Sequence, residues 1–379
     1  MTKKLYYDDA YIKSFTAEVL SVTECDDGFD VVLDQTAFFP EEGGQAADTG
    51  KIGECEVFDV YEKNGIIHHL AKNMPTLGSV DCSLDFDLRF EKMQLHTAEH
   101  IVCGIIHKLY GFENVGFHLG DDEVVFDIGG VLTREDLNRV ELLANDAVFA
   151  NLSVTTVFPS ADDLSSLEYR SKLDLTENVR IVNIGDVDSC ACCAPHVSRT
   201  GEVGLIKLLD FMKHRGGTRI WLVAGRRALL DYRSKYENIL KISALLSAPQ
   251  VDTAEVLEKT MKDVEALKNT LKRTREALAG ANAAALPNEI NNAVCFLEGF
   301  SFDELRAFAN EYKTRVGGMT VALSGDEGEF RYVIASESVD LAKEIKAINA
   351  ALSGRGGGKS RMVQGTFMTS SDEIKSYFK

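Results

Sequence analysis

Histidines and cysteines at metal-ligand spacing are the residues of this chain best suited to chemistry. His96 and His100 stand four apart in the segment HTAEH. On a helix this spacing places both imidazoles on one face, as two ligands of one zinc ion require. Cys192 and His196 are also four apart, in the segment DSCACCAPH. The four side chains would supply one sulfur and three nitrogens, which suits tetrahedral zinc. A chance pair of helical histidines, with a buried cysteine and a surface histidine elsewhere, is the alternative.

Two further thiols, Cys190 and Cys193, flank Cys192 and leave a second interpretation open, a thiol redox sensor. Cys193 lies one residue after the position that the ligand spacing requires, so we expect its side chain to point away from the metal. Four protein ligands are typical of a closed structural zinc site. A catalytic role would therefore need a displaceable ligand, an expanded coordination shell or a water molecule nearby.

The composition predicts a soluble, unsecreted, cytoplasmic protein. The 379 residues are 45% hydrophobic, yet no apolar run reaches the roughly 18 residues that a membrane span needs. Eight cysteines in this length are too few for a disulfide scaffold, so reduced thiols are expected. A net charge of −18 disfavours broad non-specific binding to nucleic acid but permits a local basic patch.

The elements that must position these residues change in character along the chain. Residues 1–90 alternate between apolar and polar positions, and Asn64-Gly65 is a strong hairpin turn, so a small antiparallel β-barrel is expected. Residues 91–232 combine helices and strands and predict an α+β domain that contains the metal residues. Its first helix covers 91–110, and Thr133 with Asp136 caps the second. The whole chain is therefore assigned to the α+β class.

A helical linker or hairpin is expected over 233–286, followed by a C-terminal α/β domain over 287–379 that could bind tRNA or mediate dimerisation. The helix should begin at Asp252 and end at Gly280. Heptad spacing relates five apolar residues, with Lys268 and Arg275 between some of them: Leu257, Met261, Val264, Leu271 and Leu278. The two cations weaken a coiled-coil interpretation, and a packed helical hairpin fits as well. A homodimer through this segment or the C-terminal domain stays open.

A family resemblance covers nearly the whole chain. The segments RFEKMQLHTAEHIVCGIIH, NVGFHLGDDEVVFDI, CCAPHVSRTGEVGLIKLLD and GGTRIWLVAGRRAL resemble, in order and spacing, the editing domain of alanyl-tRNA synthetases and of free-standing AlaX proteins. TAFFPEEGGQAADTG resembles the glycine-rich motif of the preceding small barrel. GRGGGKSRMVQG resembles the end of the C-terminal domain that alanyl-tRNA synthetases share with DHH-type phosphoesterases. Because the chain begins with the barrel, we expect no aminoacylation domain and a long AlaX protein acting in trans.

The resemblance implies an aminoacyl-tRNA deacylase that hydrolyses the ester of alanine tRNA mischarged with serine or glycine. It also implies zinc bound by His96, His100, Cys192 and His196. Zinc would polarise the ester carbonyl, hold the substrate or activate water. A catalytically silent zinc-containing tRNA-binding module is the competing hypothesis. The same resemblance suggests four further candidate catalytic residues, namely Thr97, Glu99, His118 and Gln45.

Each of these four has a plainer alternative. Thr97 could simply pack inside the helix, Glu99 could lie on a solvated helix face, and His118 could be a surface histidine. In FPEEGGQAAD, the glycines Gly43 and Gly44 suit a turn between barrel strands, with Gln45 bonding to backbone or substrate. The Gly-Gly-Gln triplet of peptide release factors is a weaker comparison.

One departure from the family concerns the cysteine loop. The family has Cys-Gly-Gly-Thr-His where this chain has Cys192-Cys193-Ala194-Pro195-His196. Pro195 fixes φ just before the last ligand. Because a side chain and the backbone near the metal have changed, the resemblance does not carry over the amino-acid preference.

Local basic segments could hold tRNA despite the acidic total. Residues 207–235 carry eight lysines and arginines against two aspartates, and a second basic group lies among glycines without a nearby acid in sequence. Phosphates can approach such glycine-rich turns closely. The expected tRNA-binding residues are Arg215, Arg219, Arg226, Arg227, Arg355, Lys359 and Arg361. An ordinary solvated surface is the alternative. The GGGKS stretch lacks the spacing of a phosphate-binding P-loop.

Overall fold

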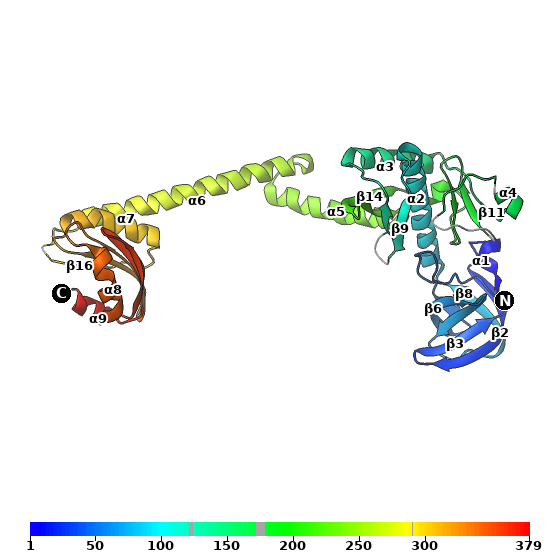
Figure 1. The fold of residues 1–379 in the computed structure, drawn as a ribbon, viewed down its shortest axis with the longest axis horizontal. Coiled ribbons are helices and arrows are strands. Elements are labelled where there is room, and N and C mark those ends of the chain that lie inside the picture. Colours follow the sequence, from blue (N-terminus) through cyan, green and yellow to red (C-terminus); the bar gives the residue numbers. More distant parts are fainter. Residues whose placement is uncertain (121–123, 165, 172–178, 290) are drawn as a thin grey trace. The chain divides into compact units, whose positions relative to one another are not determined.

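The computed structural model describes residues 1–120, 124–164, 166–171, 179–289 and 291–379. They form two compact units, residues 1–239 and 240–379 (Figure 1). Both units combine helices with β-sheets, which confirms the α+β class. The finer division at residues 90, 232 and 286 stays a prediction. Among the described helices, none is both long and apolar enough to cross a lipid bilayer.

A ring of six antiparallel strands opens the first unit. The strands are β2 (Ser14–Cys25), β3 (Gly28–Leu33), β7 (Ile66–Ala71), β6 (Cys55–Lys63), β5 (Gly50–Ile52) and β8 (Gly78–Leu84), and β8 pairs back to β2 to close a barrel. Asn64 and Gly65 both have positive φ in the turn between β6 and β7, so the predicted hairpin is confirmed. Outside the barrel, β1 (Lys3–Lys4) pairs with β4 (Gln35–Thr36) in a separate two-stranded sheet. The helix α1 (Leu5–Asp8) follows β1.

The central element of the first unit is the helix α2 (Phe86–Tyr110), which ends at Gly111 in the left-handed conformation. From Arg89 to Ile106 nearly every side chain is buried, including six polar or charged ones. A helix buried on all sides must satisfy such polar groups internally. Each buried polar side chain of α2 must therefore have a partner inside the protein.

Residues 45–48 of the barrel loop lie along α2 and make three successive polar contacts with it. Asp48 accepts hydrogen bonds from Arg89, whose side chain is 1% exposed. The ammonium group of Lys92 donates to the carbonyl oxygen of Ala46 at 3.2 Å and also to that of Ala47. Gln45 contacts His96. The barrel and α2 thus share one buried polar interface.

Two sheets flank α2. The four-stranded sheet has the order β14 (Ile206–His214), β15 (Gly217–Ala224), β10 (Val124–Ile128) and β9 (Asn114–Leu119). The three-stranded sheet has the order β11 (Val154–Val157), β12 (Ile181–Ile184) and β13 (Asp188–Ala191). The remaining elements of this region are α3 (Arg134–Phe149), α4 (Ala161–Leu164) and the short η1 (Thr200–Val203). Thr133 and Asp136 form a reciprocal capping box on α3, as predicted.

Helices dominate the passage from the first unit to the second. They are α5 (Gly225–Leu246), η2 (Gln250–Asp252) and α6 (Thr253–Ala284). The expected end of α6 at Gly280 is wrong, because the helix continues to Ala284. One interior glycine costs about 1 kcal/mol, which the packing of Ala279 and Ala283 against α7 (Phe302–Tyr312) can offset. The heptad residues are exposed: Leu257, Met261, Val264, Leu271 and Leu278.

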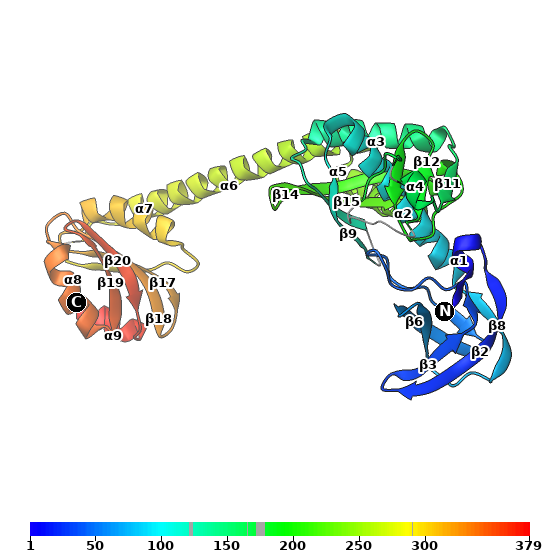
Figure 2. The same cartoon turned by 45° about the vertical axis from the view of Figure 1, so that its right-hand side comes forward.

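The second unit contains a five-stranded sheet of order β16 (Ala293–Phe296), β17 (Thr320–Asp326), β18 (Glu329–Ala335), β20 (Met362–Phe367) and β19 (Gly354–Lys359) (Figure 2). One face packs against α6 and α7, and the other against α8 (Leu341–Ala351) and α9 (Ser371–Tyr377). A short η3 (Lys313–Arg315) follows α7.

The glycine-rich stretch near the C-terminus is an edge strand, β19, rather than the expected turn. Gly356 has φ of 150°, and a Cβ there would lie 2.2 Å from the carbonyl oxygen of Gln364 and 2.7 Å from the hydroxyl of Tyr332. Glycine is needed at this position because the neighbouring strand and the tyrosine approach so closely.

Candidate metal centre

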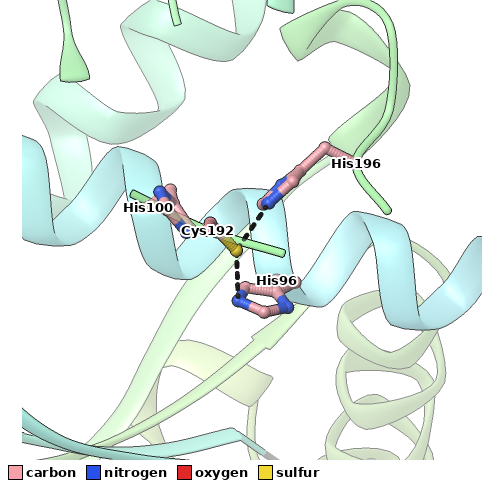
Figure 3. Close-up of side chains that lie close together, drawn as sticks. All are labelled: His96, His100, Cys192 and His196. Carbon is pink, nitrogen blue, oxygen red and sulfur yellow. Dashed lines mark hydrogen bonds between the residues drawn. The ribbon is translucent and has the colours of Figure 1, made fainter. Parts of the chain in front are cut away.

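His96 and His100 from α2 meet Cys192 and His196 from the loop that follows β13 (Figure 3). One ligand atom from each of the four residues lies within 4.8 Å of the others. The Cys192 Sγ atom is 3.4 Å from His196 Nε2 and 3.7 Å from His96 Nε2. The structure therefore brings together two pairs of residues that are far apart in sequence. Their one sulfur and three imidazoles form a group that could hold a metal ion.

The donor set and its spacing fit a tetrahedral zinc ion. Zinc–sulfur and zinc–nitrogen bonds at a tetrahedral angle separate the two ligand atoms by about 3.5 Å, and the two distances from Cys192 lie on either side of this value. Burial opposes ionisation of Cys192, but the neighbouring His96 and His196 outweigh it and hold the pKa of the thiol well below its usual value. Burial lowers the pKa of His196 to about 3, which keeps this imidazole neutral as a metal ligand must be.

Each of the three histidines uses its Nδ1 atom for a hydrogen bond away from the cluster. His96 Nδ1 is 2.9 Å from Gln45 Oε1, and His100 Nδ1 is 3.0 Å from Asp188 Oδ2. His196 Nδ1 is 3.0 Å from Thr97 Oγ1, whose own proton goes to the carbonyl oxygen of Met93. Such bonds place the ring proton on Nδ1 and leave Nε2 able to bind a metal.

Replacing Gln45 with leucine is expected to weaken metal binding by about 10- to 100-fold, because His96 would lose the acceptor that sets its tautomer and ring orientation. Gln45→Glu keeps an acceptor at the same place and should retain most of the affinity. Competition with a chromophoric chelator measures both. Equal affinities for Gln45→Leu and the natural protein would show that this hydrogen bond does not support the site.

Asp188 belongs to a buried ionic network behind His100. It accepts from Arg170 Nε at 2.7 Å and from Arg170 Nη2 at 2.9 Å. Burial would raise the pKa of Asp188, but His100 and Arg170 outweigh it and lower that pKa. His100, Asp188 and Cys190 could also form a metal-binding group. The Arg170 guanidinium already neutralises the carboxylate there, which disfavours a second cation.

The loop that carries Cys192 is fixed by Arg180, a side chain that is 7% exposed. Arg180 Nη1 donates to the carbonyl oxygens of Cys192 at 2.9 Å and Ala194 at 2.8 Å. The Cys192 amide in turn donates to the Arg180 carbonyl oxygen at 3.0 Å. These bonds hold the loop on both sides of Cys193.

A cavity of about 1110 Å³ adjoins the cluster. His96, His100 and Cys192 line it, and so does Phe117, whose ring stacks on His96 with centroids 4.7 Å apart. Barrel-side residues, among them Gly43, line another part of the wall. The cavity is large enough for a small ligand beside the metal-binding atoms.

The structure places three of the four other candidate catalytic residues around the cluster. Gln45 and Thr97 are fully buried and bond to ligand histidines. The predicted turn is also present, since Gly43 and Gly44 have positive φ between Glu42 and Gln45, whose backbones bond to each other. Glu99 is 4% exposed and lines the cavity, which excludes a solvated helix face. Cys193 lines the cavity as well, but it is not one of the four residues whose ligand atoms lie together.

His118 is the exception. It is exposed and lies beside Asp127, Arg219 and Trp221 on the other face of the four-stranded sheet. Side chains alternate along β9, so its neighbour Phe117 faces the metal cluster instead. The expectation that His118 lines the pocket is therefore corrected to Phe117.

Three of the predicted tRNA-binding cations form ion pairs, and one of these three, Arg361, is exposed like the remaining four. Arg219 forms a bidentate ion pair with Asp127, Arg227 pairs with Glu91, and Arg361 pairs with Glu337. The pairing with Glu337 shows that an acid lies near the C-terminal cations in space, although none lies near them in sequence. The remaining four exposed cations are Arg215 in the turn after β14, Arg226, Arg355 and Lys359.

Sequence reasoning missed four supporting residues: Asn114, Arg170, Arg180 and Asp188. Arg180 directly precedes the apolar strand segment IVNI, and a charge at the end of such a segment was the available signal. Nothing local marks Asn114 or Arg170, because their partners lie 15 and 18 residues away.

Two segments match known protein families. Residues 179–220 match the family described as Threonyl and Alanyl tRNA synthetase second additional domain, and residues 289–376 match the DHHA1 domain. The first match contains Cys192 and His196, and the second contains the sheet of the second unit.

Similar whole proteins extend this finding. The chain is 30% identical to the alanyl-tRNA editing protein AlaX-L of Pyrococcus horikoshii, over 99% of this chain and 96% of that protein. It is 32% identical to the alanine–tRNA ligase of Halorubrum lacusprofundi, over 90% of this chain but 39% of the ligase. A crystal structure of the C-Ala domain of Aquifex aeolicus alanyl-tRNA synthetase aligns with 24% of this chain and 91% of that domain, at 20% identity and a TM-score of 0.21.

Proposed function

This chain belongs to the family of alanyl-tRNA editing proteins, and from that premise we propose that it is a zinc-dependent hydrolase acting in trans on mischarged alanine tRNA. It would cleave the ester that joins serine or glycine to the tRNA. The observation that carries the proposal is the group of His96, His100, Cys192 and His196 at the wall of a cavity. A silent zinc-containing tRNA-binding module would share the metal-binding atoms but would not need a cavity beside them.

Ester hydrolysis requires a polarised carbonyl group and an attacking water molecule. Zinc held by the four ligands would supply the positive charge for one or both of these tasks. The protein's own contribution is to hold the ligands in place: Gln45, Asp188 and Thr97 orient the three imidazoles, and Arg180 fixes the cysteine loop. Thr97 donates its hydroxyl proton to Met93, so we assign it a positioning role through His196.

Exposed cations would hold the tRNA outside the cavity. Arg226 in the first unit, and Arg355 and Lys359 on the edge strand of the second, are exposed, as is Arg215 in the turn after β14. The paired cations, Arg219, Arg227 and Arg361, would need to exchange a carboxylate partner for a phosphate. We therefore expect the exposed cations to contribute more to tRNA binding, which should weaken as salt rises.

Deacylation assays test the proposal directly. Zinc-loaded protein is expected to release serine and glycine from tRNA(Ala) and to leave alanyl-tRNA(Ala) largely intact, because the editing reaction must spare the correct product. Release of labelled amino acid at matched enzyme concentrations measures this. Chelator-treated protein, with and without added zinc, is the control.

The outcomes separate the competing hypotheses. Tight tRNA binding without hydrolysis of any of the three esters would contradict the enzyme and support the silent module. A redox sensor would instead form a disulfide among Cys190, Cys192 and Cys193 under mild oxidation of the metal-loaded protein. Cys192 lies within hydrogen-bonding distance of two buried histidines, a setting that favours metal ligation.

A further inference from the structure

The four-stranded sheet has a hollow on its outer face, on the side away from the metal cluster. Phe126, Ile220 and Leu222 pack into the core on the inner face, and side chains alternate between the two faces along each strand. The hollow measures about 410 Å³ and is lined by residues of three adjacent strands, β9, β10 and β15. It is a second concave surface that the proposed chemistry does not use.

A row of three side chains crosses the hollow from strand to strand. Val125 of β10 is the register partner of both His118 of β9 and Trp221 of β15. His118 is exposed, and Trp221 is half-buried, so part of the indole is open to solvent. An indole in such a position offers a flat apolar surface on which another ring can stack.

A second row lies beside the first. Asp127 of β10 is the register partner of Arg219 on one side and Gly116 on the other. Arg219 Nε is 2.7 Å from Asp127 Oδ1 and Arg219 Nη2 is 2.8 Å from Asp127 Oδ2, so the guanidinium is held in one orientation two residues from Trp221. At Gly116, a Cβ would lie 3.0 Å from Asp127 Oδ2. The absent side chain therefore leaves space over this row.

Positive charge borders the hollow, although the whole chain has a net charge of −18. Residues 206–224, which form the β14–β15 hairpin, carry four cations and one acid: Lys207, Lys213, Arg215, Arg219 and Asp210. Lys213 and Arg215 are exposed. The bonded Arg219, with His214 and Arg215 nearby, holds the pKa of Asp127 below its usual value. The carboxylate inside the hollow is thus matched by cations, and the exposed cations favour a ligand that carries phosphate groups.

We propose that this hollow binds an unpaired nucleobase of RNA, which stacks on Trp221 while the adjoining phosphates contact Lys213 and Arg215. On the basis of the proposed function, the base would belong to the tRNA that carries the ester. Bases in a duplex are already stacked and paired, so the site selects unpaired nucleotides. An apolar peptide would use the indole but gain nothing from the two cations. The strand β9 would then serve two sites, with Phe117 at the metal cavity and His118 at the nucleobase.

The intrinsic fluorescence of the protein reports on this site alone, because Trp221 is the single tryptophan of the chain. Titration of the zinc-loaded full chain with a short oligoadenylate is expected to quench this fluorescence to saturation, since a stacked base quenches an indole. The same strand annealed to oligouridylate is the matched control. It should bind at least about fivefold more weakly, because its bases cannot stack on the protein.

Substitutions of Trp221 test the stacking itself. Trp221→Leu keeps an apolar side chain on the sheet but removes the ring, and it should weaken binding of labelled oligoadenylate by about 5- to 150-fold. Trp221→Phe keeps a ring and should recover most of the affinity. Phe149→Leu is the matched control, because Phe149 is 76% exposed at the end of α3 and does not line the hollow. It should change the affinity by less than about twofold. Fluorescence anisotropy measures all four proteins.

Three results would overturn the proposal: an unquenched indole at saturating oligoadenylate, equal affinities for the strand and the duplex, or a folded Trp221→Leu that binds as tightly as the natural protein. Equal affinities would mean that the cations attract phosphate without a base site. If Trp221→Leu did not fold, the titration of the natural protein with strand and duplex would still decide, because it needs no variant.

These results are distinct from those that judge the proposed function. A protein that releases serine from seryl-tRNA(Ala) without quenching by oligoadenylate would keep the deacylase and lose the nucleobase site. A protein that distinguishes strand from duplex but hydrolyses none of the esters would lose the deacylase and keep the site.

Discussion

Cys192→Ala is expected to lose the zinc and to lower ester hydrolysis by about a thousandfold or more. The substitution removes the single sulfur from the four-ligand group and leaves three imidazoles around an empty position. A metal ion contributes several kcal/mol of charge stabilisation in such reactions, and each 1.4 kcal/mol corresponds to about tenfold in rate. Zinc per chain, measured by atomic emission, and the rate of serine release from seryl-tRNA(Ala) provide the two readouts.

Neighbouring thiols supply the controls for this prediction. Cys190→Ala and Cys193→Ala each remove a thiol from the same loop or strand without removing one of the four ligands, so both proteins should keep one zinc per chain. In cobalt-substituted protein, the thiolate-to-metal absorption band should disappear with Cys192→Ala alone. Retention of zinc and of this band by Cys192→Ala would show that another thiol is the ligand.

Asp188→Asn is expected to destabilise the first unit by about 3–5 kcal/mol and to weaken metal binding by about 10- to 100-fold. The asparagine leaves the Arg170 guanidinium, whose side chain is 10% exposed, without its carboxylate. It also removes the charged acceptor of His100 Nδ1. Urea-induced unfolding of the full chain measures the first effect, and chelator competition measures the second.

Asp186→Asn provides a matched control, because Asp186 is exposed in the turn just before Asp188 and its replacement should change stability by less than about 0.5 kcal/mol. The pH dependence adds a second test. The folded-state pKa of Asp188 lies below its usual value, so its stabilisation is present above that usual value and is lost as the pH falls through the folded pKa. The unfolding free energies of natural protein and Asp188→Asn should therefore converge in acid. A constant difference would contradict the assigned ionic network.

Local rules account for the features that sequence reasoning predicted well. A helix places residues four apart on one face, which is why His96 and His100 could be paired without a structure. Asn64-Gly65 and the Thr133–Asp136 cap are equally local, since each depends on a few consecutive residues. Joining His96 to His196, which is 100 residues away, was a hypothesis from donor chemistry alone, and the family resemblance is what favoured it over a chance pair of histidines.

Features that depend on distant partners were predicted less well. Glu99 has the charge of a solvated helix residue, but α2 is covered on every side, and periodicity does not reveal this. His118 and Phe117 are both plausible pocket residues, and only the packing of β9 decides which one faces His96. Arg361 finds Glu337 across the fold. Strand β19 needs glycine at position 356 because Tyr332 and β20 approach it closely there.

The contact between residues 45–48 and α2 makes the barrel and the metal centre thermodynamically coupled. Arg89, Lys92 and His96 each receive a buried partner from that one loop. If the barrel unfolded alone, two buried cations and one ligand histidine would lose their partners at once. The free energy of that loss opposes partial unfolding, so barrel and metal cluster should unfold in a single cooperative transition. Zinc would then raise the melting temperature of the barrel, although none of its ligands comes from a barrel strand.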